Sequence, residues 1–298
     1  MNSERTIILI QGPTGIGKTS LSIKLANHLN TEIISCDSRQ FYKELRIGSA
    51  PPSKEELLKI KHHFIQNISV KDSYNISKFE IDANKKINEL FKYHDKIIVV
   101  GGSGLYADAL FNGIDEIPET SEKTRLEIQN LYNDKGIEYL KDDLYKKDET
   151  YFNYVDLKNP RRIMRALEVI YETNKTYSSF RNNTPKKRDY KIIKIGLDID
   201  RNRLYKRIND RVDVMIKSGL IEEVRSLIKY KNTNALKTIG YNEIFNYIEG
   251  DLRLDHAIEE IKKNSRRFAK RQITWLRRDN EIKYFDPEDL NGIIKFIE

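Results

Sequence analysis

The sequence contains a single cysteine, Cys36, among 298 residues. One cysteine excludes an intrachain disulfide and any zinc site built on cysteines, and we expect Cys36 to be a buried structural thiol. No apolar run approaches the length that spans a bilayer, and too few apolar residues precede Gly12 to form the core of a secretory signal. These absences predict a cytoplasmic protein with no membrane partner. The hydrophobic content of 39% is enough to fill a folded core.

Acidic residues are also absent from one window near the C-terminus, residues 262–278, which reads KKNSRRFAKRQITWLRR. Its eight lysines and arginines equal the formal net charge of the chain, +8 at pH 7. Ile261, Phe268 and Trp275 recur every seven residues, so we predict that they face the core from a long helix over about 255–278. The basic residues then fan out over the remaining surface, and the lack of acids to pair with them favours contact with nucleic acid.

Short apolar runs alternate with helical stretches in the first third of the chain. The runs cover residues 6–10, 32–36 and 96–100, and a fourth follows at 191–198. This alternation predicts an α/β fold with a P-loop NTPase-like core, in which helices flank a parallel sheet. Because ligands bind beyond the carboxyl ends of parallel strands, the polar and glycine-rich residues after the first three runs should converge on one crevice.

The alternation breaks between the third and fourth runs. Charged segments of helical character occur there at residues 122–133, 137–145 and 160–171. We interpret residues 116–190 as a mainly helical insertion domain. The P-loop α/β core then comprises residues 1–115 and 191–298, including the C-terminal helices.

The octapeptide GPTGIGKT at residues 12–19 stands between an apolar run and a periodic helical stretch. It fits the pattern G-x-x-x-x-G-K-[ST] in its expected strand, loop and helix setting, so we expect its backbone amides to cradle a diphosphate. Lys18 should neutralise phosphate oxygens, and the Thr19 hydroxyl should be the Mg²⁺ ligand. A kinase, a GTPase and an alkyl transferase could all use this cradle. The run at 97–100 leads into glycine and not into the acid that a standard NTPase uses for Mg²⁺, which weakens the ATPase hypothesis.

Two further strand ends carry polar residues. Asp37 follows the second run, where an aspartate is either a cap or turn former or, beside a phosphate cradle, a general base. Its placement favours the base. Residues 101–104, GGSG, follow the third run. They are either a tight turn into the next helix or an element that exposes backbone amides and the Ser103 hydroxyl to a ligand.

An amphipathic pattern marks the insertion at residues 160–168, PRRIMRALE. Ile163 and the apolar residues after it form one stripe, while Arg161 and Arg165 share another face. The commoner meaning of such a pattern is a solvated face with an Arg165–Glu168 ion pair, and contact with nucleic acid is the alternative.

Seven motifs together resemble the tRNA dimethylallyltransferase family, in family order and over nearly the whole chain. They are GPTGIGKT, DSRQ at 37–40, KHHFI at 61–65, VGGSGLY at 100–106, RRIMRALEV at 161–169, KTIGY at 237–241 and KRQITWLRR at 270–278. The resemblance implies transfer of a dimethylallyl group from dimethylallyl diphosphate to the exocyclic amine of the adenosine just 3′ of the anticodon in tRNA, with Mg²⁺ as cofactor. The cradle would then clamp an isoprenoid diphosphate as the leaving group. With one cysteine the chain cannot carry the usual Cys-based zinc finger that eukaryotic members often append, so it resembles the compact bacterial type, and we expect a monomer.

The resemblance also implies site residues. Asp37 would accept the proton of adenine's poorly nucleophilic amine. Ser103 stands where the family usually has threonine and keeps a hydroxyl near the diphosphate or the adenine. With Lys18 and Thr19, these are the implied catalytic residues. The implied diphosphate-binding residues are Gly12, Pro13, Thr14, Gly15, Ile16, Gly17, Lys18 and Thr19. The implied tRNA-binding residues, around a base that must leave its stack, are Asp37, Ser38, Arg39, Gln40, Ser103, Arg125, Arg161, Arg162, Ile163, Met164, Arg165, Lys237, Thr238, Ile239, Gly240, Tyr241, Asn242, Lys270, Arg271, Gln272, Ile273, Thr274, Trp275, Leu276 and Arg277.

Three other functions compete with this hypothesis. Prenylation of free adenine nucleotides would not require so extended a positive surface. A small-molecule P-loop kinase would bind ATP and transfer its phosphoryl group. A non-catalytic RNA-binding protein could use a nucleotide as a switch, and replacing Asp37 would then leave its biological activity intact.

Overall fold

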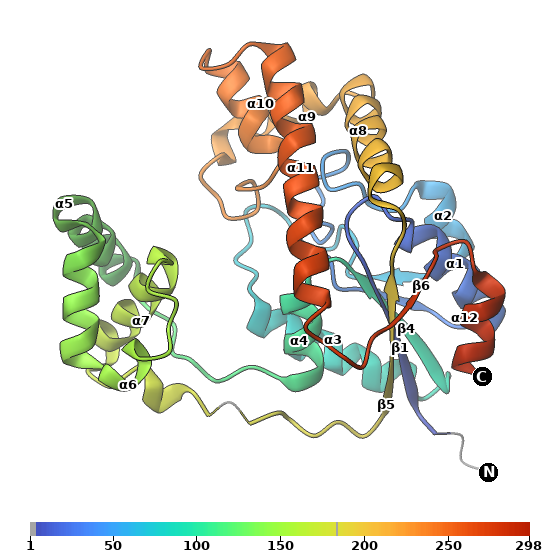
Figure 1. The fold of residues 1–298 in the computed structure, drawn as a ribbon, viewed down its shortest axis with the longest axis horizontal. Helices are drawn as coiled ribbons and strands as arrows, with labels where there is room; N and C mark the ends of the chain where they lie inside the picture. Colours follow the sequence, from blue (N-terminus) through green and yellow to red (C-terminus); the bar gives the residue numbers. More distant parts are fainter. Residues whose placement is uncertain (1–3, 183) are drawn as a thin grey trace. The chain divides into compact units, whose positions relative to one another are not determined.

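The chain divides into two compact units (Figure 1), and the computed structural model describes residues 4–182 and 184–298. The first unit comprises Met1–Phe111 and Lys187–Glu298, and the second comprises Asn112–Lys186. The boundaries lie a few residues before the expected ones at 115 and 190. Each unit has a hydrophobic core of its own.

A parallel sheet of six strands forms the centre of the first unit, in the order β3-β2-β4-β1-β5-β6. The strands are β1 Thr6–Gln11, β2 Ile33–Ser35, β3 His62–His63, β4 Lys96–Gly101, β5 Lys191–Leu197 and β6 Lys283–Phe285. The four apolar runs of the sequence form β1, β2, β4 and β5, so the predicted parallel α/β fold is confirmed. The strands β3 and β6 escape sequence analysis because two or three residues are too few to show a period.

Side chains of the central strands alternate between two hydrophobic cores. Ile8 and Ile10 of β1 enter one core, and Ile7 and Leu9 enter the other. The first core includes α1 Lys18–Leu29, α8 Arg201–Lys217 and α12 Leu290–Ile297. The second includes α3 Ile76–Leu90 and α4 Gly104–Asn112. Because both faces of the sheet are covered, the strands read as continuous apolar runs.

A third core joins α8 to the helices that lie beside it in Figure 1. These are α9 Leu220–Ser226, α10 Tyr241–Ile248 and α11 Leu254–Leu276, with a short 3₁₀ turn, η2, at Ile228–Tyr230. A small helix, α2 Lys54–Lys59, precedes β3. Among all the helices of the described residues, none is both long and apolar enough to cross a membrane.

The helix α11 confirms the predicted long C-terminal helix but buries a different stripe of it. Ile261, Ala269 and Leu276 are buried. Phe268 is 38% exposed, so its predicted place in the core is wrong. Trp275 is only half-buried. A strict seven-residue repeat drifts by about 20° per heptad around a straight α-helix. The buried residues of α11 accordingly follow steps of three or four residues, as Ala269, Gln272 and Leu276 do, and not steps of seven.

The second unit is built from helices around a core that includes Ile128 and Leu140. Its elements are α5 Glu122–Lys147, α6 Glu149–Phe152, α7 Pro160–Thr173 and η1 Ser178–Phe180. Gly136, with φ 76° and ψ −178°, interrupts α5 and gives the two segments that the sequence predicts. Ser121 begins α5 by accepting a hydrogen bond from the Thr124 amide. The stripe that starts at Ile163 is buried in this core, as predicted.

Ile261 and Phe268 should therefore differ in their contribution to stability. Ile261→Ala opens a cavity in the third core and should lower the free energy of unfolding by about 2–5 kcal/mol. Phe268→Ala removes a partly exposed ring and should cost about 1 kcal/mol. Urea denaturation followed by circular dichroism measures both values. Equal losses in the free energy of unfolding would indicate that Phe268 packs in the core as Ile261 does.

Candidate functional site

The phosphate loop, residues 12–19, runs from the end of β1 into the first turn of α1. Gly15 and Gly17 have φ of 79° and 111°, which are left-handed values that favour glycine. Gly17 is the N-cap of α1, so no side chain at this position competes with an anion for the first amides of the helix. The strand, loop and helix setting predicted for an anion cradle is present.

Lys18 turns back into this loop. Its Nζ donates hydrogen bonds to the carbonyl oxygens of Gly12 (3.0 Å) and Pro13 (2.9 Å). The pKa of Lys18 is lowered to about 8, mainly by burial; Asp37 opposes this shift and Arg211 adds to it. An anion held in the loop would favour the charged ammonium form.

Asp37 lies in the same pocket as Lys18 and Thr19, directly after β2. One carboxylate oxygen accepts a hydrogen bond from the Arg39 amide at 3.1 Å. Asp37 is therefore a turn former and a pocket residue at once, and the two interpretations of its sequence position do not compete. The pocket is also lined by the hydroxyls of Ser22 and Ser35 and by the apolar side chains of Pro52, Ile65 and Val100.

The donor set of this pocket suits Mg²⁺ better than a transition metal. Among the described residues, no group of three or more His, Cys, Asp or Glu side chains is placed to hold a metal. The pocket offers the Thr19 hydroxyl and the Asp37 carboxylate, both oxygen ligands. Mg²⁺ prefers oxygen, keeps several waters and commonly takes one or two protein ligands together with substrate phosphates. The Thr19 hydroxyl fits that pattern as a ligand, with the Asp37 carboxylate in the same pocket.

Gln272 of α11 connects the phosphate loop to the glycine turn after β4. Its Oε1 accepts a hydrogen bond from the Thr14 amide (2.9 Å), and its Nε2 donates to the Gly102 carbonyl (2.7 Å). The side chain is 8% exposed and hydrogen-bonded to these two partners in this structure, and its role in tRNA binding stays a prediction. The motif KRQITWLRR includes Gln272, but the sequence alone does not show whether its side chain binds other parts of the protein or tRNA.

Arg211 is a site residue that sequence analysis misses. It extends from α8 to the loop, where its Nη1 lies 3.4 Å from Thr14 Oγ1. Burial lowers the pKa of the guanidinium, and the attraction of Asp37 opposes this shift. No local signal could have found Arg211, because it is one of several basic residues along α8 and no motif surrounds it.

Ser103 lies in the glycine turn at 101–104, half-buried, and its carbonyl accepts hydrogen bonds from the amides of Tyr106 and Ala107 at the start of α4. The turn borders the phosphate loop, since a Cβ added to Gly102 would lie 3.5 Å from Lys18 Nζ. At Gly104 the Trp275 ring leaves no room for a Cβ. The turn therefore both starts a helix and belongs to the site.

The predicted tRNA-binding residues differ widely in exposure. Ile163, Tyr241 and Leu276 have buried side chains in this structure, and their role in tRNA binding stays a prediction. Gly240 is buried as well. The half-buried members are Ser38, Arg39, Gln40, Ser103, Met164, Arg165, Thr238, Ile239, Ile273 and Trp275. The exposed members are Arg125, Arg161, Arg162, Lys237, Asn242, Lys270, Arg271, Thr274 and Arg277.

Some of the half-buried members already have protein partners. Arg39 Nη1 donates to the carbonyl oxygens of Asn234 (2.7 Å) and Ala235 (3.1 Å). Gln40 Nε2 donates to the Ala50 carbonyl at 3.0 Å. In this structure both side chains hold loops around the pocket.

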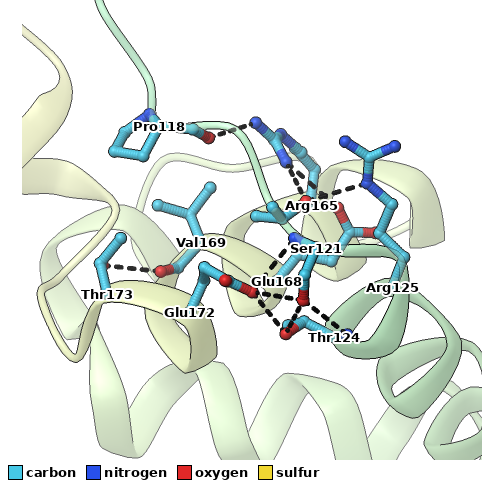
Figure 2. A network of polar contacts seen from close by, with 10 residues as sticks. Pro118, Ser121, Thr124, Arg125, Arg165, Glu168, Val169, Glu172 and Thr173 are labelled. Atoms are coloured by element: carbon cyan, nitrogen blue, oxygen red, sulfur yellow. Dashed lines mark hydrogen bonds and ion pairs between the residues drawn. The ribbon is translucent and has the colours of Figure 1, made fainter.

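Arg165 joins the start of α5 to α7 within the second unit, as Figure 2 shows. Its guanidinium donates to Thr120 Oγ1 (2.9 Å), to the Pro118 carbonyl (2.9 Å) and to Glu168 (3.3 Å). The Arg165–Glu168 pair expected of a solvated helix face is thus present. Arg125 Nε also donates to Thr120 Oγ1, at 3.0 Å. The guanidinium of Arg165 is occupied by structure, whereas Arg161 and Arg162 have no ion pair within the described residues.

The basic side chains of α11 differ in their partners, and Arg266 donates a hydrogen bond to Asn209 at 2.6 Å. Lys262 pairs with Asp213 of α8 at 2.8 Å, and Lys263 pairs with Glu260 at 2.7 Å. The expectation that this window lacks acidic partners is therefore wrong at its N-terminal end. Arg267, Lys270 and Arg271 are exposed and form no ion pair with any described residue. These three are the free positive surface of the helix.

The parallel sheet, the glycine loop and Lys18 together define an α/β protein with a P-loop core. Within that class, a family model described as IPP transferase matches residues 40–279. The chain belongs to this family.

Relatives and solved structures agree with this assignment. The tRNA dimethylallyltransferase of Christiangramia forsetii is 50% identical over 98% of this chain and 97% of its own length. The tRNA isopentenylpyrophosphate transferase of Bacillus halodurans is 34% identical, covers 99% of this chain and 96% of its own, and has a TM-score of 0.72. A eukaryotic dimethylallyltransferase acting on tRNA is 27% identical over 96% of this chain and 75% of its own, with a TM-score of 0.78.

The pKa of Lys18 gives the anion site a pH dependence. With a pKa of about 8 in the free protein, Lys18 is mostly charged at pH 7 and mostly neutral at pH 9. Pyrophosphate should bind more weakly as the pH rises through about 8, and above that pH its binding should take up a proton. Calorimetry in two buffers of different ionisation enthalpy measures this uptake. In Lys18→Met the uptake between pH 8 and 9 should disappear; an unchanged uptake would assign it to another group.

Proposed function

We propose that this chain transfers the dimethylallyl group of dimethylallyl diphosphate to the exocyclic amine of the adenosine 3′-adjacent to the anticodon in tRNA and releases diphosphate. The observation that carries the proposal is the meeting of a phosphate loop and a carboxylate in one pocket, in a chain of the IPP transferase family. A tRNA substrate also accords with a cytoplasmic location, and we expect the enzyme to act as a monomer.

The cradle supplies the leaving-group clamp in this reaction. An allylic diphosphate departs with additional negative charge on its bridging oxygen, and fixed cations and amides stabilise that charge without reorganising. Lys18 donates to the Pro13 carbonyl and Arg211 to the Thr14 hydroxyl, so both cations contact the loop. Bound Mg²⁺ would supply further charge neutralisation, held by the Thr19 hydroxyl, which leaves Asp37 available as the base.

Asp37 is the base in this proposal. The lone pair of an adenine amine is delocalised into the ring, so the amine becomes a good nucleophile only as its proton is removed. A carboxylate within reach of that nitrogen accepts the proton while the new N–C bond forms and the C–O bond to diphosphate breaks. Asp37 is the carboxylate that lines the pocket beside Lys18.

The RNA would be held by unpaired positive charge. In the first unit this charge lies on α11 at Arg267, Lys270 and Arg271, and in the second unit Arg161 and Arg162 are exposed. Such side chains neutralise backbone phosphates and make affinity strongly dependent on salt. A free nucleotide, the substrate of the main alternative, would need few of them, and the names of the close relatives favour tRNA.

Transfer of label tests the proposal directly. The protein is incubated with radiolabelled dimethylallyl diphosphate, Mg²⁺ and either total tRNA or adenine nucleotides. Label should appear in tRNA, on the adenosine next to the anticodon. Label on free nucleotides alone would favour the mononucleotide prenyltransferase, and ATP-dependent phosphoryl transfer without prenylation would favour the kinase.

The role of Asp37 can be separated from its turn. Asp37→Asn keeps an oxygen for the Arg39 amide but cannot take up a proton, so turnover in the transfer assay should fall by about 10²-fold or more while tRNA affinity changes little. Asp37→Ala also loses the turn hydrogen bond and should be no more active. An Asn variant with near-normal turnover would end the assignment of Asp37 as base.

The two groups of charges on α11 provide a matched comparison for RNA binding. The double variant Arg267→Ala/Lys270→Ala removes two unpaired charges, and each lost phosphate contact should reduce the magnitude of the log–log salt slope by about 0.7 to 0.9. The control Lys262→Ala/Lys263→Ala also removes two charges, but these are paired within the protein. Its slope should change less. Equal salt slopes for the wild type and both variants would indicate that the basic face of α11 contacts solvent and not RNA.

A further inference from the structure

The two histidines of β3 have opposite surroundings. Side chains alternate along a strand, so consecutive residues face opposite sides of the sheet. His63 pairs with Glu32, with His63 Nε2 and Glu32 Oε2 2.5 Å apart. His62 lines the pocket that contains Lys18, Thr19 and Asp37. The catalytic roles described above make no use of His62.

The protonation of His62 follows from its neighbours. Its Nδ1 lies 2.8 Å from the carbonyl oxygen of Ile60, which can only accept a hydrogen bond, so Nδ1 carries the proton. Burial lowers the pKa of His62, although this carbonyl and Glu56 act against the shift, and the ring is neutral near pH 7. In a neutral imidazole with a proton on Nδ1, Nε2 presents a lone pair.

That lone pair is buried without a partner. Across the described residues, only two buried side-chain polar atoms lack a hydrogen-bond partner, His62 Nε2 and Thr233 Oγ1, and Thr233 is not among the residues that line the pocket. Buried polar atoms are nearly always hydrogen-bonded, and an exception at a functional site calls for an explanation. Here the explanation is a donor that arrives with the substrates.

We infer that His62 Nε2 is a hydrogen-bond acceptor for an O–H or N–H donor brought into the pocket by the reactants. This inference rests on the proposed function, which delivers two such donors: waters around the Mg²⁺ that accompanies the diphosphate, and the N–H of the adenine amine that is not lost in the reaction. Both fit a neutral acceptor that shares a pocket with Thr19, the expected metal ligand, and with Asp37, the expected base.

Substitutions at His62 test the acceptor. His62→Phe keeps the ring shape and removes the lone pair. His62→Gln keeps an oxygen near the position of Nε2 and should restore much of the lost function. His63→Gln is the matched control, because it alters the neighbouring residue on the other side of the strand. Thermal melting with circular dichroism checks that each variant is folded, and the Gln variant keeps the test informative if the Phe variant is not.

Two measurements separate the two donors. The first is the affinity for pyrophosphate in the presence of Mg²⁺, by calorimetry without RNA; the second is kcat/KM for an anticodon stem-loop. Loss of one neutral hydrogen bond should cost about fivefold to tenfold. A loss in His62→Phe that already appears in pyrophosphate binding assigns the donor to metal-bound water. A loss confined to kcat/KM for the RNA assigns it to the amine.

A folded His62→Phe variant that matches the wild type in both measurements would overturn the inference. So would a His62→Gln variant as impaired as His62→Phe, because then ring shape and not the lone pair would matter. The wild type is assayed first with labelled substrate and RNA. A failure of the proposed function therefore appears in the wild type, whereas a failure of the role of His62 appears only in the comparison of variants.

Discussion

The ammonium group of Lys18 is held by two carbonyl oxygens, of Gly12 and Pro13, and the rest of the site follows from that arrangement. Carbonyl dipoles orient the cation but do not neutralise it, so burial depresses its pKa to about 8. The phosphate loop therefore favours the binding of an anion, which would neutralise the charge of Lys18. The glycines at 15 and 17, with their left-handed backbone, allow the loop to turn around the lysine.

The long helix α11 performs two tasks because its faces differ. On one face Gln272 and Trp275 reach the glycine turn at Gly102 and Gly104, where a side chain of any size would collide with them. On the other face Arg267 and Lys270 stay exposed and unpaired within the described chain. In the proposed function, an RNA bound to the exposed face would be held by the same helix that contacts the phosphate loop at Thr14.

Periodicity and local motifs predicted the parts of the molecule that repeat or stand alone. The four apolar runs and the loop at 12–19 can be predicted because each is a contiguous stretch of sequence. Asp37 can be predicted because it directly follows an apolar run. The role of Arg211 cannot be predicted from the sequence, because only the packing of α8 brings its side chain to Thr14. Asp213, which pairs with Lys262, lies on α8. A count of charges within residues 262–278 therefore cannot detect this ion pair, which depends on the packing of two helices. The core prediction for Phe268 is wrong because it assumes that a heptad repeat stays in register from Ile261 to Trp275, about four turns, and on a straight helix it does not.

One carboxylate links the two halves of the proposed reaction. Asp37 raises the pKa of Lys18 and so favours the charged form of the lysine, and it also attracts the guanidinium of Arg211. When Asp37 accepts the proton of the amine it loses its own charge, and the departing diphosphate then takes its place as the counter-charge for these cations. The protonated acid must return its proton to solvent before it again competes with diphosphate for Lys18 and Arg211. Recovery of the charge on Asp37 therefore favours release of diphosphate, so that the group that starts the reaction also helps to clear its product.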